Sequence, residues 1–188
     1  MKTIEIIGYN RANLGKKTAK ELRTLSQVPC VLYGGKQQVH FSVPMILFRD
    51  LLYTPEVHQV DLNIEGTHYK AIVQDAQFHP VNEMILHVDF LELDENKPVK
   101  MNIPVRLQGT AVGVTKGGKL ISKLRKLTVS ALPKDMPDYV TVDVSGLDLG
   151  KSIKVGEVNA ENFVILNSPS NPVASIEIPR GLRGKSAE

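Results

Sequence analysis

Three strand-like runs separated by short turns occupy the middle of this 188-residue chain and constrain its fold more than any other feature. Residues 57–64 alternate apolar and polar side chains, Glu65-Gly66 follows as a hairpin turn, and residues 67–78 form a long second run. Residues 79–82, reading HPVN, turn the chain again before a third run at 84–91. Alternation is typical of half-buried strands, and two-residue turns join antiparallel neighbours. The segment therefore predicts an antiparallel sheet.

The rest of the N-terminal half supplies the strands needed to close such a sheet. Residues 3–9 and 39–43 are strand-like. Pro44 suits the first turn of a helix, for which we expect Leu47, Leu51 and Leu52 to form the buried side. The pattern predicts a mostly antiparallel β unit with two helical inserts, closed or nearly closed into a small barrel.

Residues 15–35, reading GKKTAKELRTLSQVPCVLYGG, combine a basic helix with an apolar strand. We expect Ala19, Leu22 and Leu25 on one side of the helix, Pro29 to end it, and a strand up to Tyr33. Residues 1–36 hold seven Lys/Arg and two Glu, a net charge of +5. Such a helix can hold cations against a polyanion, and an ordinary solvated amphipathic helix explains the same pattern equally well.

The C-terminal half is predicted to be a separate β domain. The polar, proline-ended stretch at residues 93–98 marks the boundary, which gives domains at 1–93 and 94–179 and a disordered Gly, Lys and Ser tail at 180–188. Four strand-like runs follow the boundary, at residues 99–107, 119–132, 139–144 and 174–178. A helical turn fits residues 155–160. The fold class is mainly β, with an N-terminal barrel and a C-terminal all-β domain.

Composition excludes several functional classes. The chain has one cysteine, so it forms no internal disulfide, which fits a reducing cytoplasm. It lacks Trp and is 5% aromatic, which disfavours a stacking platform for single-stranded nucleic acid. No apolar run approaches the roughly 20 residues that span a bilayer, and Glu5 interrupts the N-terminal apolar run too early for a signal peptide. We expect a soluble, intracellular, cytoplasmic protein.

Three enzymatic or ligand-binding hypotheses are weak. Residues 113–119, reading GVTKGGK, match seven positions of a phosphate-binding loop, but Leu120 follows where Ser or Thr would hold magnesium, so we expect a glycine hairpin. Cys30 lies in an apolar strand, where a core role is more common than a nucleophilic one. His79, His87 and Asp89 lack the close paired spacing of metal sites. We expect no catalytic residue, metal, cofactor or small-molecule substrate.

Two neighbouring strands present polar groups together. In residues 87–90, reading HVDF, alternation places His87 and Asp89 on one face and Val88 and Phe90 on the other. The preceding strand carries the polar segment QDAQ at residues 74–77. Amide, imidazole and carboxylate groups on one face can bind base edges and ribose hydroxyls. An ordinary solvated sheet face is the alternative.

These motifs carry a family resemblance. The runs LGKKTAKELRTLSQVPCVLYGG, VQDAQFHP and LHVDF, in this order and spacing, resemble the bacterial large-subunit ribosomal protein L-twenty-five family. Residues 103–153 resemble the additional C-terminal β domain of the long form, the general stress or CTC type. The resemblance covers nearly the whole chain.

The resemblance implies a six-stranded β-barrel with short helices that binds the loop E helix of 5S ribosomal RNA. By position, the implied RNA-binding residues are Arg11, Lys16, Arg23, Tyr33, Gln74, Gln77, His79, His87 and Asp89. The chain departs from the family pattern where Glu21 and Phe78 replace residues that are often basic, and where residues 81–84, reading VNEM, lack a usual cation.

The predicted function is therefore that of a non-enzymatic structural constituent of the large ribosomal subunit. The implied partners are 5S ribosomal RNA and other large-subunit components, with no membrane partner. The alternative is a stress-response protein-interaction module whose RNA contact is incidental and whose C-terminal domain is the active part. Co-sedimentation with large ribosomal subunits at physiological salt separates the two.

Overall fold

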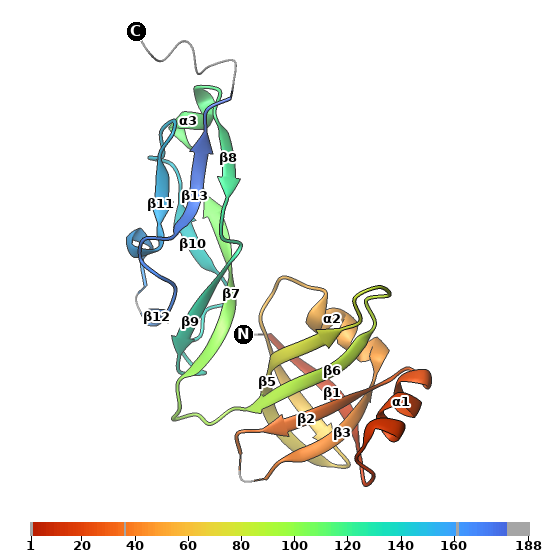
Figure 1. Cartoon of the computed structure of the whole chain (residues 1–188). Helices are drawn as coiled ribbons and strands as arrows, with labels where there is room; N and C mark the ends of the chain where they lie inside the picture. Colours follow the sequence, from red (N-terminus) through yellow and green to blue (C-terminus); the bar gives the residue numbers. More distant parts are fainter. Residues whose placement is uncertain (1, 36, 161, 180–188) are drawn as a thin grey trace. The chain divides into compact units, whose positions relative to one another are not determined.

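The structure is a computed structural model that describes residues 2–35, 37–160 and 162–179, and it divides into two compact units, Met1–Val99 and Lys100–Glu188 (Figure 1). The tail predicted at residues 180–188 lies outside the described residues. The polar stretch at 93–98, predicted as the boundary, falls at the end of the first unit. The sequence-based limits at 93 and 94 stay a prediction.

The first unit is a closed six-stranded barrel, as the sequence predicts. The strands occur around the barrel in the order β1-β3-β2-β6-β5-β4. Two contacts, β1 with β4 and β2 with β6, are parallel, and the other four are antiparallel. Their bounds are β1 Lys2–Asn10, β2 Gln27–Tyr33, β3 Val39–Pro44, β4 His58–Ile64, β5 Thr67–Phe78 and β6 Ile85–Glu92.

Alternation along the strands fills the barrel with apolar side chains. β4 shows the pattern most plainly, because every second residue from His58 to Ile64 is buried. Three fully buried rings lie in this core: the ring centroid of Phe90 is 5.7 Å from that of Phe41 and 6.3 Å from that of Phe48. The barrel closes through a short contact between β1 and β3, in which Tyr9 pairs with Ser42 and Asn10 with Phe41.

The predicted hairpin between β4 and β5 is confirmed at Glu65-Gly66. Both residues have positive φ, 49° and 87°, as a two-residue turn between twisted strands requires. The Asn63 side chain supports the turn, because its Oδ1 accepts a hydrogen bond from the Gly66 N–H at 3.0 Å.

The basic helix α1, Lys16–Thr24, ends earlier than Pro29 and lies on the barrel surface. None of its nine residues is buried, and Leu25, expected on the apolar side, is 72% exposed because the helix has already ended. Ser26 takes a positive φ of 57° as the chain turns into β2. Pro29 is a buried residue within β2 rather than a helix stop.

The second helical insert is shorter than predicted. It consists of a 3-10 turn η1, Met45–Phe48, followed by the four-residue helix α2, Arg49–Leu52. Phe48 and Leu51 are its buried residues, whereas Leu47 is 37% exposed. The predicted stripe was wrong at Leu47, because the tighter 3-10 turn brings Phe48 toward the core instead.

The second unit contains two small sheets. One has the order β10-β7-β9-β12 and the other β11-β13-β8. The single strand predicted at residues 119–132 is wrong: it is two strands in different sheets, broken at 123–125. The bounds are β7 Val99–Gln108, β8 Lys119–Ser122, β9 Lys126–Ala131, β10 Val140–Asp143, β11 Ser152–Lys154, β12 Val164–Ile165 and β13 Pro172–Glu177. A 3-10 turn η2, Val155–Glu157, confirms the predicted helical turn.

The glycine-rich segment at residues 113–119 is a packing junction and not a hairpin. It forms the end of a one-turn helix α3, Val112–Thr115, and leads into β8. A Cβ at Gly113 would lie 2.8 Å from the Asp148 carbonyl carbon, and one at Gly118 would lie 2.6 Å from the Gly113 oxygen. The two glycines therefore allow close backbone approach, and Lys116 forms an ion pair with Asp148 at 2.9 Å.

Candidate nucleic-acid interface

A bulge in β5 decides which side chains the barrel presents outward. Val73 pairs with Phe90, and the next pair is Asp75 with Asp89, so Gln74 is an extra residue in β5. Without the extra residue, the alternation that points Val73 into the barrel would also point Asp75 and Gln77 inward. The bulge turns Asp75 and Gln77 to the outside, where both are exposed.

β6 presents His87 and Asp89 on this same outer face. Val88, which lies between them, and Phe90, which follows Asp89, are completely buried. This confirms the predicted register of the strand. Nδ1 of His87 lies 2.6 Å from Oδ1 of Asp89, so the two side chains brace each other. Gln77 pairs across the strands with His87. We call the outward set Asp75, Gln77, His87 and Asp89 the polar face.

A second bulge ties the basic helix to this face. Gln77 pairs with His87 and Phe78 with Ile85, which leaves Leu86 without a partner in the β5–β6 ladder. The Nε–H of Arg23 on α1 donates to the Leu86 carbonyl oxygen at 2.9 Å. Arg23 thereby satisfies a backbone acceptor and fixes the end of α1 beside the polar face.

The other cations of α1 remain exposed. Lys16, Lys17 and Lys20 all lie on its surface, and the helix has no acidic residue in its first turn. Long exposed lysines on a helix held by Arg23 supply positive charge next to a polar sheet face. Figure 1 shows α1 lying against the barrel at β2, with β6 as the next strand.

Two further predicted residues, Arg11 and Tyr33, lie at the ends of β1 and β2. Arg11 follows β1, its N–H donates to the His40 carbonyl oxygen at 3.0 Å, and its Nε is buried with no hydrogen-bond partner in the described part of the chain. Tyr33 ends β2. Burial raises the pKa of its hydroxyl, and the carboxylates of Asp89 and Asp75 raise it further, so the phenol stays protonated as a donor.

Not all the predicted residues come together. Tyr33, Gln77, His87 and Asp89 share the outer surface of neighbouring strands, and Arg23 borders it. No hydrogen bond among the described residues joins the side chains of Lys16 or Gln74 to this group. His79 holds its own turn, since its Nδ1 accepts from the N–H groups of Val81 and Asn82 at 3.3 and 3.4 Å.

The sequence-based list omitted Asp75. Strand alternation from Val73 would have placed Asp75 toward the core, and only the bulge at Gln74 brings it opposite Asp89. A signal was present in the sequence, because a carboxylate inside a small apolar barrel is costly. Two carboxylates therefore face outward as cross-strand neighbours.

Two of the positions that depart from the family pattern are exposed at the end of β5 and in the turn that follows it. Phe78 is 43% exposed and meets Tyr53 edge-on, with ring centroids 6.3 Å apart. Val81 is 85% exposed in the turn after β5. Apolar side chains are thus exposed at positions where the family pattern often has cations.

The alternative chemistries find little support in the described residues. Cys30 is completely buried, and burial raises the pKa of its thiol, which is the condition of an unreactive core cysteine. No group of three or more His, Cys, Asp or Glu side chains in the described residues is placed to hold a metal ion. Within the same residues, every helix is too short or too polar to cross a membrane.

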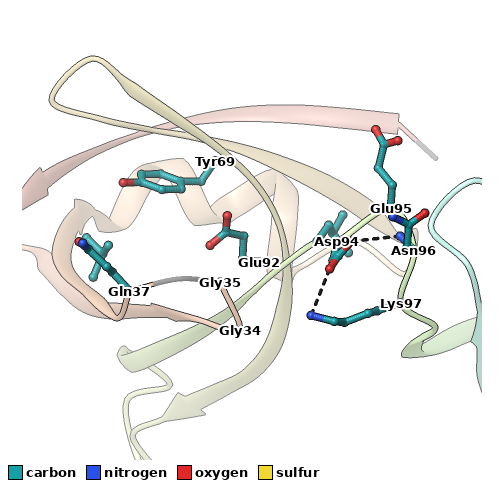
Figure 2. A pocket seen from close by; sticks show the side chains of 11 residues that line it. Gly34, Gly35, Gln37, Tyr69, Glu92, Asp94, Glu95, Asn96 and Lys97 are labelled. Atoms are coloured by element: carbon teal, nitrogen blue, oxygen red, sulfur yellow. Dashed lines mark hydrogen bonds and ion pairs between the residues drawn. The ribbon is translucent and has the colours of Figure 1, made fainter.

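An open pocket lies in the first unit where β2 and β6 end (Figure 2). Its lining includes Gly34, Gly35, Tyr69, Glu92 and Asp94. The backbone N–H of Asn96 and the ammonium of Lys97 lower the pKa of Asp94, which therefore stays ionised. The carboxylates make this pocket a poor site for a polyanion and separate it chemically from the polar face.

Comparison with known proteins gives matches over both units. Residues 6–90 match the Ribosomal L25p family, and residues 98–180 match the family described as Ribosomal protein TL5, C-terminal domain. The large ribosomal subunit protein bL25 of Cytophaga hutchinsonii is 58% identical over 187 residues, which is 100% of this chain and 97% of that protein. The bL25 proteins of Amoebophilus asiaticus and Phocaeicola vulgatus are 57% and 47% identical, cover 100% of this chain, and are covered to 96% and 98%.

The resemblance and the fold class predicted from the sequence are therefore confirmed. The barrel carries the L25p part and the two-sheet unit carries the TL5 C-terminal part, as in the long form of the family. Proteins of this family are structural and not enzymatic. Identity at this level over the full length of the relatives shows that this chain belongs to the large ribosomal subunit protein bL25 family.

Proposed function

We propose that this protein binds 5S ribosomal RNA, at its loop E helix, through α1 and the polar face of the barrel, as a constituent of the cytoplasmic ribosome. The observation that carries the proposal is the attachment of α1 to the bulge of β6 by the Arg23–Leu86 hydrogen bond. This bond places flexible cations and a rigid hydrogen-bonding face side by side. The proposed contacts are the nine residues predicted from the sequence, with Lys17, Lys20 and Asp75 added.

The chemistry of the two parts differs. Lys16, Lys17 and Lys20 would contact phosphates, which supplies affinity and position without sequence preference. The polar face would contact the wide, shallow minor groove of an RNA helix, where 2′-hydroxyls and base edges are accessible. Asp75 and Asp89 would be repelled by phosphate, so they select for hydroxyl or amino donors of the RNA.

Rigidity supports the second role. His87 and Asp89 are braced by each other at 2.6 Å and held by a strand whose other side is fully buried. The tautomer with hydrogen on Nδ1 would donate to Asp89 and leave Nε2 as an acceptor for an RNA hydroxyl or amino group. A preorganised face of this kind loses little conformational entropy on binding.

The test of the proposal is the salt dependence of 5S RNA binding by full-length protein. We expect Lys16→Gln/Lys17→Gln/Lys20→Gln to weaken binding and to reduce the slope of log K against log salt by about two to three, at roughly 0.7–0.9 per phosphate contact. The measurement is a titration of purified 5S RNA at several salt concentrations.

A control with the same loss of charge is Arg49→Gln/Lys70→Gln/Lys97→Gln, which removes exposed cations of the barrel outside α1 and the polar face. We expect this variant to retain nearly the wild-type slope. Equal slopes for the two triple variants would contradict the role of α1. Failure of the wild-type protein to sediment with large subunits at physiological salt would favour the protein-interaction alternative.

A further inference from the structure

The second unit carries the net positive charge of this chain. Residues 1–99 contain ten Lys/Arg and twelve Asp/Glu, a net charge of −2, whereas residues 100–188 contain thirteen and eight, a net charge of +5. Within the second unit, residues 98–134 contain eight Lys/Arg and neither Asp nor Glu. A surface of one sign attracts a polyanion and accelerates its association.

The strand register shows where part of this block lies. The N–H of Val105 donates to the Arg125 carbonyl oxygen at 2.9 Å, and Thr128 Oγ1 donates to Asn102 Oδ1 at 2.9 Å. β7 and β9 are therefore antiparallel neighbours, with Asn102 and Thr128 on the same side. Because side chains alternate, that side carries every second residue of both strands. These residues are Lys100, Asn102, Pro104, Arg106 and Gln108 of β7, and Lys126, Thr128 and Ser130 of β9.

The opposite side of the same strands is the core of the sheet. Ile103, Leu127 and Val129 are completely buried. The register of β10 extends the outer side by Thr141, which is exposed and pairs with Arg106. We call Lys100, Asn102, Arg106, Lys126, Thr128, Ser130 and Thr141 the basic sheet face. It contains three cations, three hydroxyls and one amide, and the same side continues at the ends of β7 and β10 with Gln108 and Asp143, which pair with each other.

Arg106 is held in place at the edge of this face. Its guanidinium carbon lies 4.1 Å from the ring centroid of Tyr139, which is 43% exposed. The stack fixes a planar cation next to an accessible aromatic ring. The carboxylate of Asp143, at the end of β10 on this same side, is occupied within its own turn, because it accepts hydrogen bonds from the Ser145 hydroxyl and N–H.

We propose that the basic sheet face binds structured RNA, as a second contact that is independent of the barrel. The three cations would bind phosphates, and the hydroxyls and the amide would bind ribose hydroxyls and phosphate oxygens. A protein partner fits less well, because the cores of protein interfaces are apolar and depleted in charge. The inference goes beyond the proposed function, since it concerns the other unit and another stretch of RNA.

The experiment compares two full-length variants that lose the same charge. Lys100→Gln/Arg106→Gln/Lys126→Gln alters the basic sheet face, and Lys119→Gln/Lys151→Gln/Lys154→Gln alters exposed cations of the β11-β13-β8 segment. The probe is the purified long RNA of the large ribosomal subunit without 5S RNA. We expect the slope of log K against log salt to fall by about two to three in the first variant, at roughly 0.7–0.9 per phosphate contact. In the second variant, the same slope should fall by less than about one. Equal slopes would overturn the proposal.

Crosslinking tests the same face without removing a cation. Thr141→Cys, carrying a benzophenone, should crosslink to RNA in large subunits, whereas Glu157→Cys in η2 should not. The native Cys30 is buried and stays unlabelled. Crosslinks from position 141 to a ribosomal protein, or none above the control, would overturn the proposal. The salt slope measured on the long RNA without 5S RNA is independent of 5S binding, which the α1 variants report separately.

Discussion

Phe90→Ala is expected to destabilise the barrel by about 3–5 kcal/mol, the range for removing a buried aromatic side chain. Phe90 is completely buried, and its ring packs against those of Phe41 and Phe48 at 5.7 and 6.3 Å. Removing it leaves a cavity between β6, β3 and η1, which carry the three rings. Chemical denaturation followed by a probe of the barrel measures the loss.

The control for this prediction is Phe78→Ala, which removes the same side chain from a position that is 43% exposed. We expect a loss of less than about 1 kcal/mol there, as for most surface substitutions. If Phe90→Ala left the unfolding midpoint unchanged while His87→Ala lowered it sharply, the register of β6 would be reversed. The core would then lie on the side assigned to RNA.

Asp89→Ala and His87→Ala should each weaken binding to 5S RNA by about 1–3 kcal/mol, or roughly 5- to 150-fold, because each removes a hydrogen bond to a partner excluded from water. Asp89 is the more informative position. A carboxylate near RNA repels phosphate, so its removal improves affinity unless it accepts a hydrogen bond from the RNA or orients His87. Equilibrium titration of 5S RNA at fixed salt measures the effect.

The barrel offers a matched control for this pair. His68 and Asp61 form a similar contact, Nδ1 to Oδ1 at 3.2 Å, between β4 and β5. Asp61→Ala removes the same charge from another part of the barrel surface, and we expect it to leave the affinity nearly unchanged. Asp89→Ala binding as tightly as the wild type, or more tightly, would show that the polar face is not a recognition surface.

The strands of the barrel could be predicted from the sequence because alternation and turn residues agree along residues 57–91. The hairpin at Glu65-Gly66 and the register of β6 followed from these local signals alone. The split of residues 119–132 could not be predicted in the same way. The run is strand-like throughout, and only tertiary pairing assigns β8 and β9 to different sheets.

The candidate interface could be predicted in part for a similar reason. Cations on α1 and the alternation of His87 and Asp89 are visible in one segment each. The bulges at Gln74 and Leu86 depend on pairing between strands, and they decide that Asp75 faces outward and that Arg23 has a backbone acceptor. The outward position of Asp75 was therefore invisible to strand alternation.

The parallel contacts of the barrel have a consequence for its synthesis. β1 pairs along its length with β4, from Lys2 with His58 to Gly8 with Ile64, and β2 pairs with β6, from Cys30 with Val88 to Tyr33 with Leu91. Because β1 is synthesised first, its edge that faces β4 stays unpaired until β4 has emerged from the ribosome. Closure waits further for β6, the last barrel strand to leave the ribosome that is making it. Since β6 also carries His87 and Asp89, a nascent chain cannot present the complete polar face before the barrel is able to close.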